Sequence, residues 1–232
     1  MQKDFIKKYV PENAKLHLVG HSIGSWMILN MLKDDDIAKK ITKCYLIFPT
    51  IEHMARTTNG WWFNRVSSFI SEIILDESIG CQLNKNNFFQ ISKIAFFLIF
   101  MCSLFSILPR SLQIFCLNMI LPLIPIPLKY NNAMLQFLNP DTVKRVIKMA
   151  EEEMEIVKER DDDTISKYAD KLWFYYGNCD DWVPVTYYKN LMFKHPELNA
   201  VLCKHGYRHS FVLQYDNQMG KLVGDKINDN IV

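Results

Sequence analysis

The sequence has few of the features that mark a metal site, an oxidising compartment or a nucleic-acid partner. There is no Cys-x-x-Cys pair and no Cys/His spacing typical of metal ligands, so we expect free thiols in a reducing compartment and no metal site. A formal net charge of +2 gives no indication of a nucleic-acid partner. The first ten residues are charged and lack an apolar core, so we expect no secretory signal there. The six cysteines are scattered along the chain: Cys44, Cys81, Cys102, Cys116, Cys179 and Cys203.

The sequence GHSIG, residues 20–24, is a G-x-S-x-G pattern that stands between a strand-like and a helix-like run. The run 16–19 leads in and the run 26–32 leads out. This order predicts a nucleophile elbow, a sharp strand-to-helix turn that holds a serine in a strained backbone conformation. We expect the two glycines there because a Cβ at either position would crowd the turn. The alternative is an ordinary glycine-rich turn.

The apolar runs of the chain predict a parallel sheet with helices in one α/β domain. Residues 43–48 form a second strand, and two strands around one helix make a βαβ unit with parallel strands. Later runs predict strands at 171–176 and 200–203, with a helix at 186–194 between them. We expect residues 34–36 to be a solvated connection. Residues 4–10 would be the end of an amphipathic helix, with four residues on one side: Phe5, Ile6, Tyr9 and Val10.

Three polar residues that follow predicted strands form a candidate catalytic set. A serine is a poor nucleophile until an imidazole takes its proton and a carboxylate holds that imidazole in the right tautomer. Ser22, Asp180 and His209 occur in the chain order of α/β hydrolases. Because each follows a strand, all three would project from the same carboxyl edge of a parallel sheet. Asp181 remains an alternative to Asp180, and His205 remains an alternative to His209.

The other histidines have structural interpretations. We expect His17 to pack in the strand before the elbow and His21 to line the turn. His53 and His195 would be structural or exposed.

The tetrahedral intermediate of ester hydrolysis needs two hydrogen-bond donors for its oxyanion. One would be the backbone N–H of Ile23, the residue after the nucleophile, and the second normally comes from the loop after an earlier strand. Only residues 1–15 precede the first predicted strand, so we expect N-terminal strands of the fold to be missing. No cofactor is needed for this chemistry.

The whole chain, residues 1–232, would then be one partial α/β-hydrolase domain. Its core would be residues 1–50 and 170–232, and residues 51–169 would form a large helical insertion, or cap. Residues 139–160 of this cap have helical spacing, with Asn139 as the N-cap and Pro140 in the first turn.

The middle of the predicted cap is strongly apolar, since Arg110 is the one charged residue between positions 94 and 128. Residues 94–108 would form a helix about 22 Å long, shorter than a hydrocarbon core of about 30 Å. Three prolines, Pro122, Pro125 and Pro127, prevent further helix. Two short apolar arms around a polar turn favour a hairpin at residues 94–128 that lies in one leaflet, with a phospholipid monolayer as the partner. The alternative is a soluble cap whose apolar helices line an acyl pocket.

The chain resembles the lipid droplet-associated serine hydrolase family of the α/β-hydrolase superfamily. The resemblance rests on LVGHSIGSWM, LIFPTIEHMARTTNG, MAEEEM, FYYGNCDDWVP and HSFV, and it covers nearly the whole chain. It implies a Ser22–Asp180–His209 triad, targeting to lipid droplets and the endoplasmic reticulum through the apolar cap, and a role in the turnover of ester lipids such as sterol esters or acylglycerols. The expected departure from the family is a missing N-terminal part.

The sequence therefore predicts a serine ester hydrolase that acts on lipid esters at a droplet surface. Two alternatives stay open. One is a non-catalytic droplet-surface protein that retains a hydrolase fold, and the other is a soluble esterase with an apolar cap.

Overall fold

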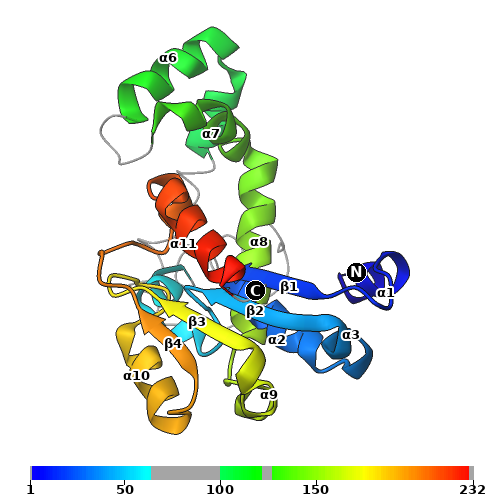
Figure 1. Ribbon diagram of the computed structural model, residues 1–232. Coiled ribbons are helices and arrows are strands. Elements are labelled where there is room, and N and C mark those ends of the chain that lie inside the picture. The colour runs from blue at the N-terminus through cyan, green and yellow to red at the C-terminus, as the bar shows by residue number, and fades with distance from the viewer. Residues whose placement is uncertain (1, 64–99, 122–126, 230–232) are drawn as a thin grey trace, which may run out of the picture. The chain divides into compact units, whose positions relative to one another are not determined.

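The described residues contain a sheet of four parallel strands (Figure 1). The computed structural model describes residues 2–63, 100–121 and 127–229. Within these ranges the strands lie in the order β1-β2-β3-β4, and every neighbouring pair is parallel. Parallel neighbours need a crossover connection between them, so the predicted alternation of strands and helices is confirmed. The strands are β1 (Leu16–His21), β2 (Ile41–Ile47), β3 (Leu172–Tyr176) and β4 (Asn199–Leu202).

Helices cover both faces of the sheet (Figure 1). On β3, Phe174 and Tyr176 face one side and Trp173 and Tyr175 face the other, because side chains alternate along a strand. All five residues of β3 are buried, which explains why its sequence reads as a continuous apolar run. The first face packs against α2 (Ile23–Leu32), α3 (Asp35–Lys40), α9 (Asp162–Lys167) and α10 (Val185–Lys194), and the second against α11 (Asp216–Asn228).

Two local predictions near the start of the chain are wrong in part. Asp35 and Asp36 are solvated, with side chains 71% and 77% exposed, but they begin α3 and are not a connection. Helix α1 (Gln2–Tyr9) forms as expected, but Phe5 and Tyr9 are exposed and do not share the buried side of Ile6. In segments this short, the sequence pattern does not indicate which side packs against the rest of the fold.

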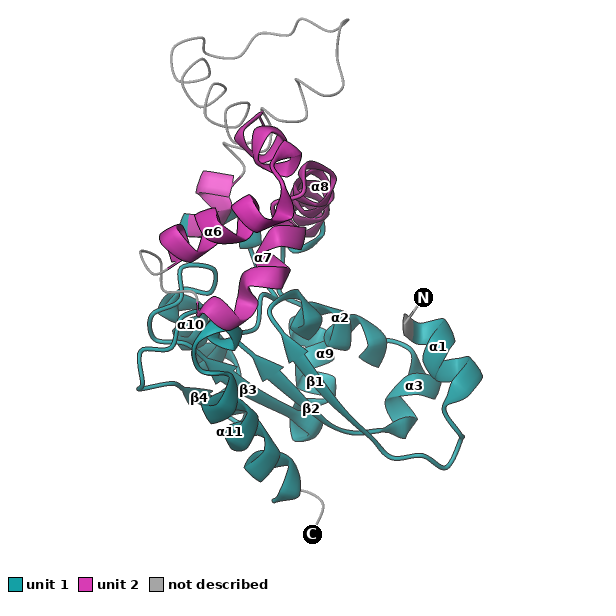
Figure 2. Ribbon diagram, turned by 90° about the horizontal axis from the view of Figure 1, so that it is seen from above, with its two compact units in different colours: residues 1–58, 156–232 teal, residues 59–155 magenta. Residues whose placement is uncertain are grey.

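The described chain divides into two compact units (Figure 2). The core unit is residues 1–58 with 156–232, and the helical unit is residues 59–155. Residues 156–169, which the sequence analysis assigned to the cap, group with the sheet, since Ile165 and Tyr168 pack in its apolar core. The boundaries of the predicted cap otherwise stay a prediction.

The described part of the helical unit consists of helices. They are the segments 59–63 and 100–107, α6 (Arg110–Ile120), α7 (Asn131–Phe137) and α8 (Pro140–Ile156), with a 3₁₀ turn η3 (Leu128–Tyr130) before α7. Leu117, Leu121 and Leu135 form its apolar centre. As expected, the Asn139 side chain caps α8, accepting hydrogen bonds from the N–H groups of Asp141 at 3.0 Å and Thr142 at 3.4 Å. The helix ends at residue 156, before the predicted end at 160.

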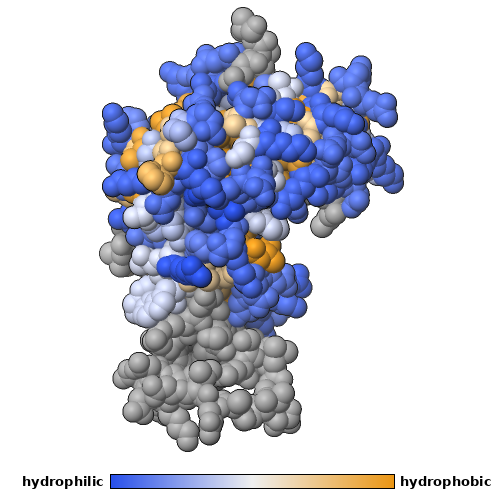
Figure 3. Space-filling view, turned by 90° about the horizontal axis from the view of Figure 1, so that it is seen from below, coloured by the Kyte–Doolittle hydropathy of each residue, from blue (hydrophilic) through white to orange (hydrophobic). Residues whose placement is uncertain are grey.

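Much of the predicted apolar hairpin is described, but residues 94–99 and 122–126 of it lie outside the described ranges. No helix in those ranges combines the length and the apolar character needed to cross a bilayer. Figure 3 shows one face of the molecule, on which hydrophilic residues predominate and apolar residues form small separate patches.

Inside the core unit, the segment just before residue 59 and the segment just after residue 155 lie side by side. The N–H of His53 donates to the carbonyl of Lys158 at 2.6 Å, and the N–H of Met54 donates to the carbonyl of Val157 at 3.2 Å. Met54 begins a 3₁₀ turn, η1 (Met54–Arg56). These two bonds join the segment that follows β2 to the segment that precedes α9.

A buried ion pair reinforces the same junction. Arg160 Nη1 donates to Glu52 Oε1 at 2.8 Å, and the two side chains are 8% and 9% exposed. Arg160 Nε also donates to Asp162 Oδ1 at 2.7 Å, and the Asp162 carboxylate pairs with Lys194 and His195. Burial raises the pKa of Glu52, and the charge of Arg160 partly offsets that effect. His195 is therefore structural, as the sequence predicts.

Candidate functional site

Ser22 occupies a sharp turn between β1 and α2, as the G-x-S-x-G pattern predicts. Its backbone has φ 56° and ψ −125°, a left-handed conformation that strains a residue with a side chain. The turn persists because its surroundings hold it: the Ser22 N–H donates to the carbonyl of Ile47, at the end of the neighbouring strand, at 3.1 Å. The serine hydroxyl is thereby fixed at the carboxyl edge of the sheet.

The two glycines of the pattern do not have the same role. A Cβ on Gly20 would lie 2.7 Å from the backbone of Gly24 and 2.7 Å from Ile28 Cδ1, so the turn requires glycine there. A Cβ on Gly24 would meet no atom within 4 Å among the described residues. The expectation that both glycines prevent crowding is correct at Gly20 and wrong at Gly24.

The structure brings Ser22, His209 and Asp180 together, although they are far apart in sequence. His209 Nε2 lies 2.7 Å from Ser22 Oγ, and His209 Nδ1 lies 2.7 Å from Asp180 Oδ2. The Asp180 side chain is fully buried and the His209 side chain is 16% exposed. A hydroxyl, an imidazole and a carboxylate thus form one continuous hydrogen-bonded chain.

The loop after β3 orients the Asp180 carboxylate. Its Oδ1 accepts hydrogen bonds from the N–H groups of Trp182 at 2.8 Å and Val183 at 3.1 Å, which leaves Oδ2 for His209. These two bonds fix the direction in which the carboxylate faces. When Oδ2 accepts a hydrogen bond from the N–H at His209 Nδ1, His209 Nε2 carries a lone pair that can accept the Ser22 hydroxyl. The alternatives, Asp181 and His205, are both exposed.

His21 forms a hydrogen bond with the backbone of His209, a contact that the sequence did not predict. Its Nε2–H donates to the backbone carbonyl of His209 at 3.0 Å. Burial, and then the neighbouring His209, lower the pKa of His21 to about 4. His21 is therefore neutral at pH 7, and the bond to a carbonyl requires its proton to be on Nε2. His17 packs in β1 as expected, with its Nδ1 3.2 Å from the Tyr45 hydroxyl.

Aromatic rings surround the His209 imidazole. Phe48 meets it edge-on at a centroid distance of 6.2 Å, and Trp182 is tilted against it at 6.3 Å. Phe48 can approach because residue 177 is glycine, where a Cβ would lie 2.2 Å from the Phe48 ring. An environment of this kind limits water around the imidazole and strengthens its hydrogen bonds.

The N–H of Ile23, the oxyanion donor that the sequence predicts, lies at the N-terminus of α2. Ile23 is the first residue of α2, and the first N–H groups of a helix have no carbonyl partner within that helix. The partial positive charge at a helix N-terminus favours negative charge at this point. An oxygen that accepts from this N–H would lie next to Ser22.

Thr50 also belongs to this site, and the sequence analysis missed it. Its buried hydroxyl lies 3.0 Å from Ser22 Oγ. The signal in the sequence was its position just after the second strand, the same kind of position that singled out the other three residues.

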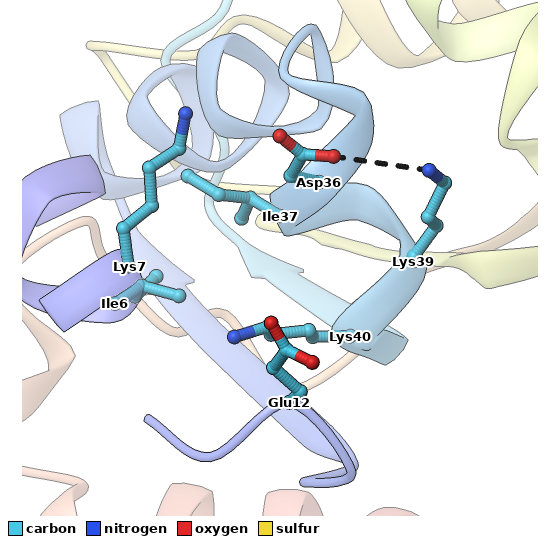
Figure 4. Close-up of a pocket in the computed structure, with 7 residues that line it drawn as sticks. All are labelled: Ile6, Lys7, Glu12, Asp36, Ile37, Lys39 and Lys40. Carbon is cyan, nitrogen blue, oxygen red and sulfur yellow. Dashed lines mark ion pairs between the residues drawn. The ribbon is translucent and has the colours of Figure 1, made fainter. Parts of the chain in front are cut away.

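Two other features are separate from this site. Among the described residues, no three His, Cys, Asp or Glu side chains gather in a way that could hold a metal ion. A pocket lined by residues of α1, α3 and the segment between α1 and β1 contains none of the residues around Ser22 (Figure 4). Its charged groups include Lys39 and Asp36, which form an exposed ion pair at 3.8 Å.

A family model described as "Lipid-droplet associated hydrolase" matches residues 1–212. The chain belongs to this family. The resemblance noted from the sequence motifs is therefore confirmed.

Relatives named "Lipid droplet-associated hydrolase" match almost the whole chain. The protein from Drosophila melanogaster is 33% identical over 226 residues, which is 97% of this chain and 66% of the relative. The protein from Mus musculus is 30% identical and that from Homo sapiens 28%, covering 97% and 98% of this chain. The chain spans only 61–66% of the length of these relatives.

Solved structures support the fold class. A thioesterase domain from the curacin biosynthetic pathway matches with a TM-score of 0.51 at 10% identity, over 96% of this chain and 70% of that one. A marine microorganism esterase matches with a TM-score of 0.51 at 12% identity, over 97% and 74%. At such identities the likeness shows the fold alone, and it confirms the predicted α/β-hydrolase fold.

Proposed function

We propose that this chain carries the catalytic centre of a serine ester hydrolase. Ser22 is the nucleophile, His209 is the general base, and Asp180 orients and stabilises the imidazole. The observation that supports this most is the pair of 2.7 Å contacts that link Ser22 Oγ through His209 to Asp180. The strained turn at Ser22 and the family membership point the same way.

The first half of the proposed reaction transfers the acyl group to the enzyme. Ser22 Oγ forms a bond to the ester carbonyl carbon while its proton passes to His209 Nε2. Asp180 stabilises the resulting imidazolium, and the N–H of Ile23 donates to the oxyanion. The bond from carbon to the alcohol oxygen then breaks, and the departing alcohol takes the proton from Nε2.

The second half regenerates the serine. Water attacks the acyl carbon and gives its proton to His209 Nε2. The bond from carbon to Ser22 Oγ breaks, and the proton returns from Nε2 to Oγ. The net reaction is the hydrolysis of one ester to an acid and an alcohol, and no cofactor takes part.

We further propose a lipid ester, such as a sterol ester or an acylglycerol, as the substrate. The family is described as lipid-droplet associated, and the helical unit presents apolar side chains to solvent. On α6 the exposed residues Leu112, Phe115 and Met119 recur at helical spacing. An apolar helix face of this kind fits the acyl boundary of a droplet or endoplasmic reticulum surface.

A fluorophosphonate probe tests the nucleophile directly, because it reacts only with an activated serine. We expect covalent labelling of the protein, and complete loss of labelling in Ser22→Ala. Ser166→Ala, which removes an exposed serine in α9, is the matched control and should label like the wild type. Equal labelling of wild type and Ser22→Ala would exclude Ser22 as the nucleophile.

The same exposed apolar side chains favour a second candidate, a non-catalytic droplet-surface protein that retains the hydrolase fold. The two candidates differ in their dependence on Ser22. If the surface role is the whole function, Ser22→Ala changes neither droplet size nor lipid turnover in cells. If the protein is a hydrolase, the variant loses the turnover and keeps its place on the droplet.

A further inference from the structure

Thr50 contacts the proposed nucleophile twice. Its Oγ1 lies 3.0 Å from Ser22 Oγ, and its backbone N–H donates to the Ser22 carbonyl at 3.2 Å. Thr50 is only 1% exposed, and within the described residues its hydroxyl bonds to Ser22 Oγ alone. The position of the Thr50 hydroxyl is therefore tied to the position of Ser22 Oγ.

The chain on both sides of Thr50 is anchored. Before it, the N–H of Phe48 donates to the carbonyl of Tyr175 on the neighbouring strand at 2.7 Å. After it, Ile51 is buried in the core of the sheet, and Glu52 forms the buried ion pair with Arg160. The backbone at Thr50 is therefore fixed on both sides, and this fixes the position of its side chain.

The direction of the hydrogen bond follows from the neighbouring groups. While neutral His209 has its proton on Nδ1, its Nε2 accepts the Ser22 hydroxyl. Ser22 Oγ then has only lone pairs to offer, so the hydroxyl of Thr50 must donate to it. One bond points the serine proton at the base, and the other fixes the oxygen that carries the proton.

We infer that Thr50 is a positioning residue that holds Ser22 Oγ in the orientation from which its proton passes to His209. This inference rests on the proposed function. Without the Thr50 hydroxyl, Ser22 Oγ can rotate away from Nε2 about its single side-chain torsion.

The same bond serves both halves of the reaction. In the first half, Ser22 Oγ bonds to the carbonyl carbon and its proton moves to Nε2, so the starting distance to Nε2 matters. In the second half, the bond from carbon to Oγ breaks and Oγ takes the proton back from Nε2. Negative charge that develops on the departing Oγ strengthens a hydrogen bond donated by Thr50.

Three substitutions at position 50 test the inference in the full chain. Thr50→Val keeps the shape and removes the hydroxyl, while Thr50→Ser and Thr50→Ala differ from each other only by an oxygen. A misplaced reacting group costs up to about a hundredfold in rate. We therefore expect Thr50→Val and Thr50→Ala to lower both the rate of fluorophosphonate labelling and kcat for p-nitrophenyl butyrate by about ten- to a hundredfold. KM stays unchanged, and Thr50→Ser recovers most of the rate.

Thr164→Val is the matched control for loss of a buried threonine hydroxyl. Thr164 is 8% exposed, and its Oγ1 donates to Asp161 Oδ2 at 2.8 Å at the start of α9. This variant should lose stability comparably and label at the wild-type rate. If Thr50→Val does not fold, the comparison of Thr50→Ser with Thr50→Ala gives the same answer.

The outcomes separate this inference from the proposed function. If the wild type is not labelled, the proposed function fails and the inference fails with it. If the wild type is labelled at Ser22, but folded Thr50→Val and Thr50→Ala react at the wild-type rate, only the role of Thr50 is overturned. A fall in rate that Thr50→Ser does not restore would also overturn it, because the effect would then come from packing.

Discussion

The imidazole of His21 donates a hydrogen bond to the backbone carbonyl of His209 at 3.0 Å. Position 21 is the variable residue before the serine of the G-x-S-x-G pattern, and position 209 follows the last strand of the sheet. The turn that presents the proposed nucleophile therefore also holds the loop that presents the proposed base. The nucleophile and the base cannot move apart without breaking this bond.

We expect the stability of the protein to depend on pH through His21. Burial, and then the neighbouring His209, lower its pKa to about 4 in the folded state, against about 6.5 in the unfolded chain. Since the unfolded chain binds the proton more tightly, the free energy of unfolding falls as pH decreases from about 6.5 to about 4, by at most about 3 kcal/mol. Urea titrations across this range measure the slope.

His21→Gln is the control for that measurement, because it keeps an N–H donor for the His209 carbonyl and cannot be protonated. The difference in stability between wild type and His21→Gln should shrink or reverse toward acid pH. Parallel pH profiles for the two proteins would contradict the prediction.

Asp180→Asn should abolish most activity without unfolding the protein. The two backbone donors at Oδ1 hold the amide oxygen in that place, which turns the amide nitrogen toward His209 Nδ1. The amide then donates, the imidazole proton moves to Nε2, and Nε2 can no longer accept from Ser22. We expect kcat for p-nitrophenyl butyrate to fall about ten-thousandfold. Asp181→Asn, at an exposed neighbour, should retain activity; equal losses in the two variants would argue against Asp180.

The two glycines of the elbow should respond differently to alanine. Gly20→Ala places a methyl group 2.7 Å from the Gly24 backbone and should cost about 1–3 kcal/mol or prevent folding. Gly24→Ala meets open space in the first turn of α2 and should stabilise the protein by up to about 1 kcal/mol. Melting temperatures distinguish them, and a similar loss at both positions would refute the asymmetry.

Removing one partner of the buried pair Glu52–Arg160 should lower the free energy of unfolding more than replacing both partners. Arg160→Met leaves the Glu52 carboxylate without its partner and should cost about 3–5 kcal/mol. Replacing both residues with apolar ones, in Glu52→Leu/Arg160→Met, should cost less than the single change. Chemical denaturation of both variants measures the coupling, and additive losses would contradict it. Lys39→Met, in the exposed pair with Asp36, should leave the melting temperature unchanged.

Charges placed on the exposed face of α6 should weaken binding to a lipid surface. Phe115 is 61% exposed and Met119 is 63% exposed, one turn apart. Phe115→Asp/Met119→Asp should lower flotation with phospholipid-coated triolein droplets at least about tenfold, because two apolar side chains no longer enter the monolayer. Phe193→Asp changes a 92% exposed side chain of the core unit and is the control. Unchanged flotation of the double variant would show that α6 is not the contact.

The sheet and the turn at Ser22 could be predicted because their signals are local. Continuous apolar runs such as 171–176 indicate strands that are buried on both faces, and the glycine at position 20 marks a close backbone approach. The carboxyl ends of parallel strands meet at one edge, so chain order alone placed Ser22, Asp180 and His209 near one another. The three predicted residues share one signal: Ser22 directly follows β1, and Asp180 and His209 lie in the loops after β3 and β4.

What the amino-acid sequence determined by itself was the fold class, the elbow and the family. Only the tertiary structure decided that Thr50 and His21 touch the site, that residues 35 and 36 begin a helix, and that α9 packs with the sheet. These facts depend on which surfaces meet across long stretches of chain. A single hydroxyl or imidazole leaves no periodic pattern in the sequence that would identify its partner. Its role becomes visible only when the folded backbone brings that partner within hydrogen-bonding distance.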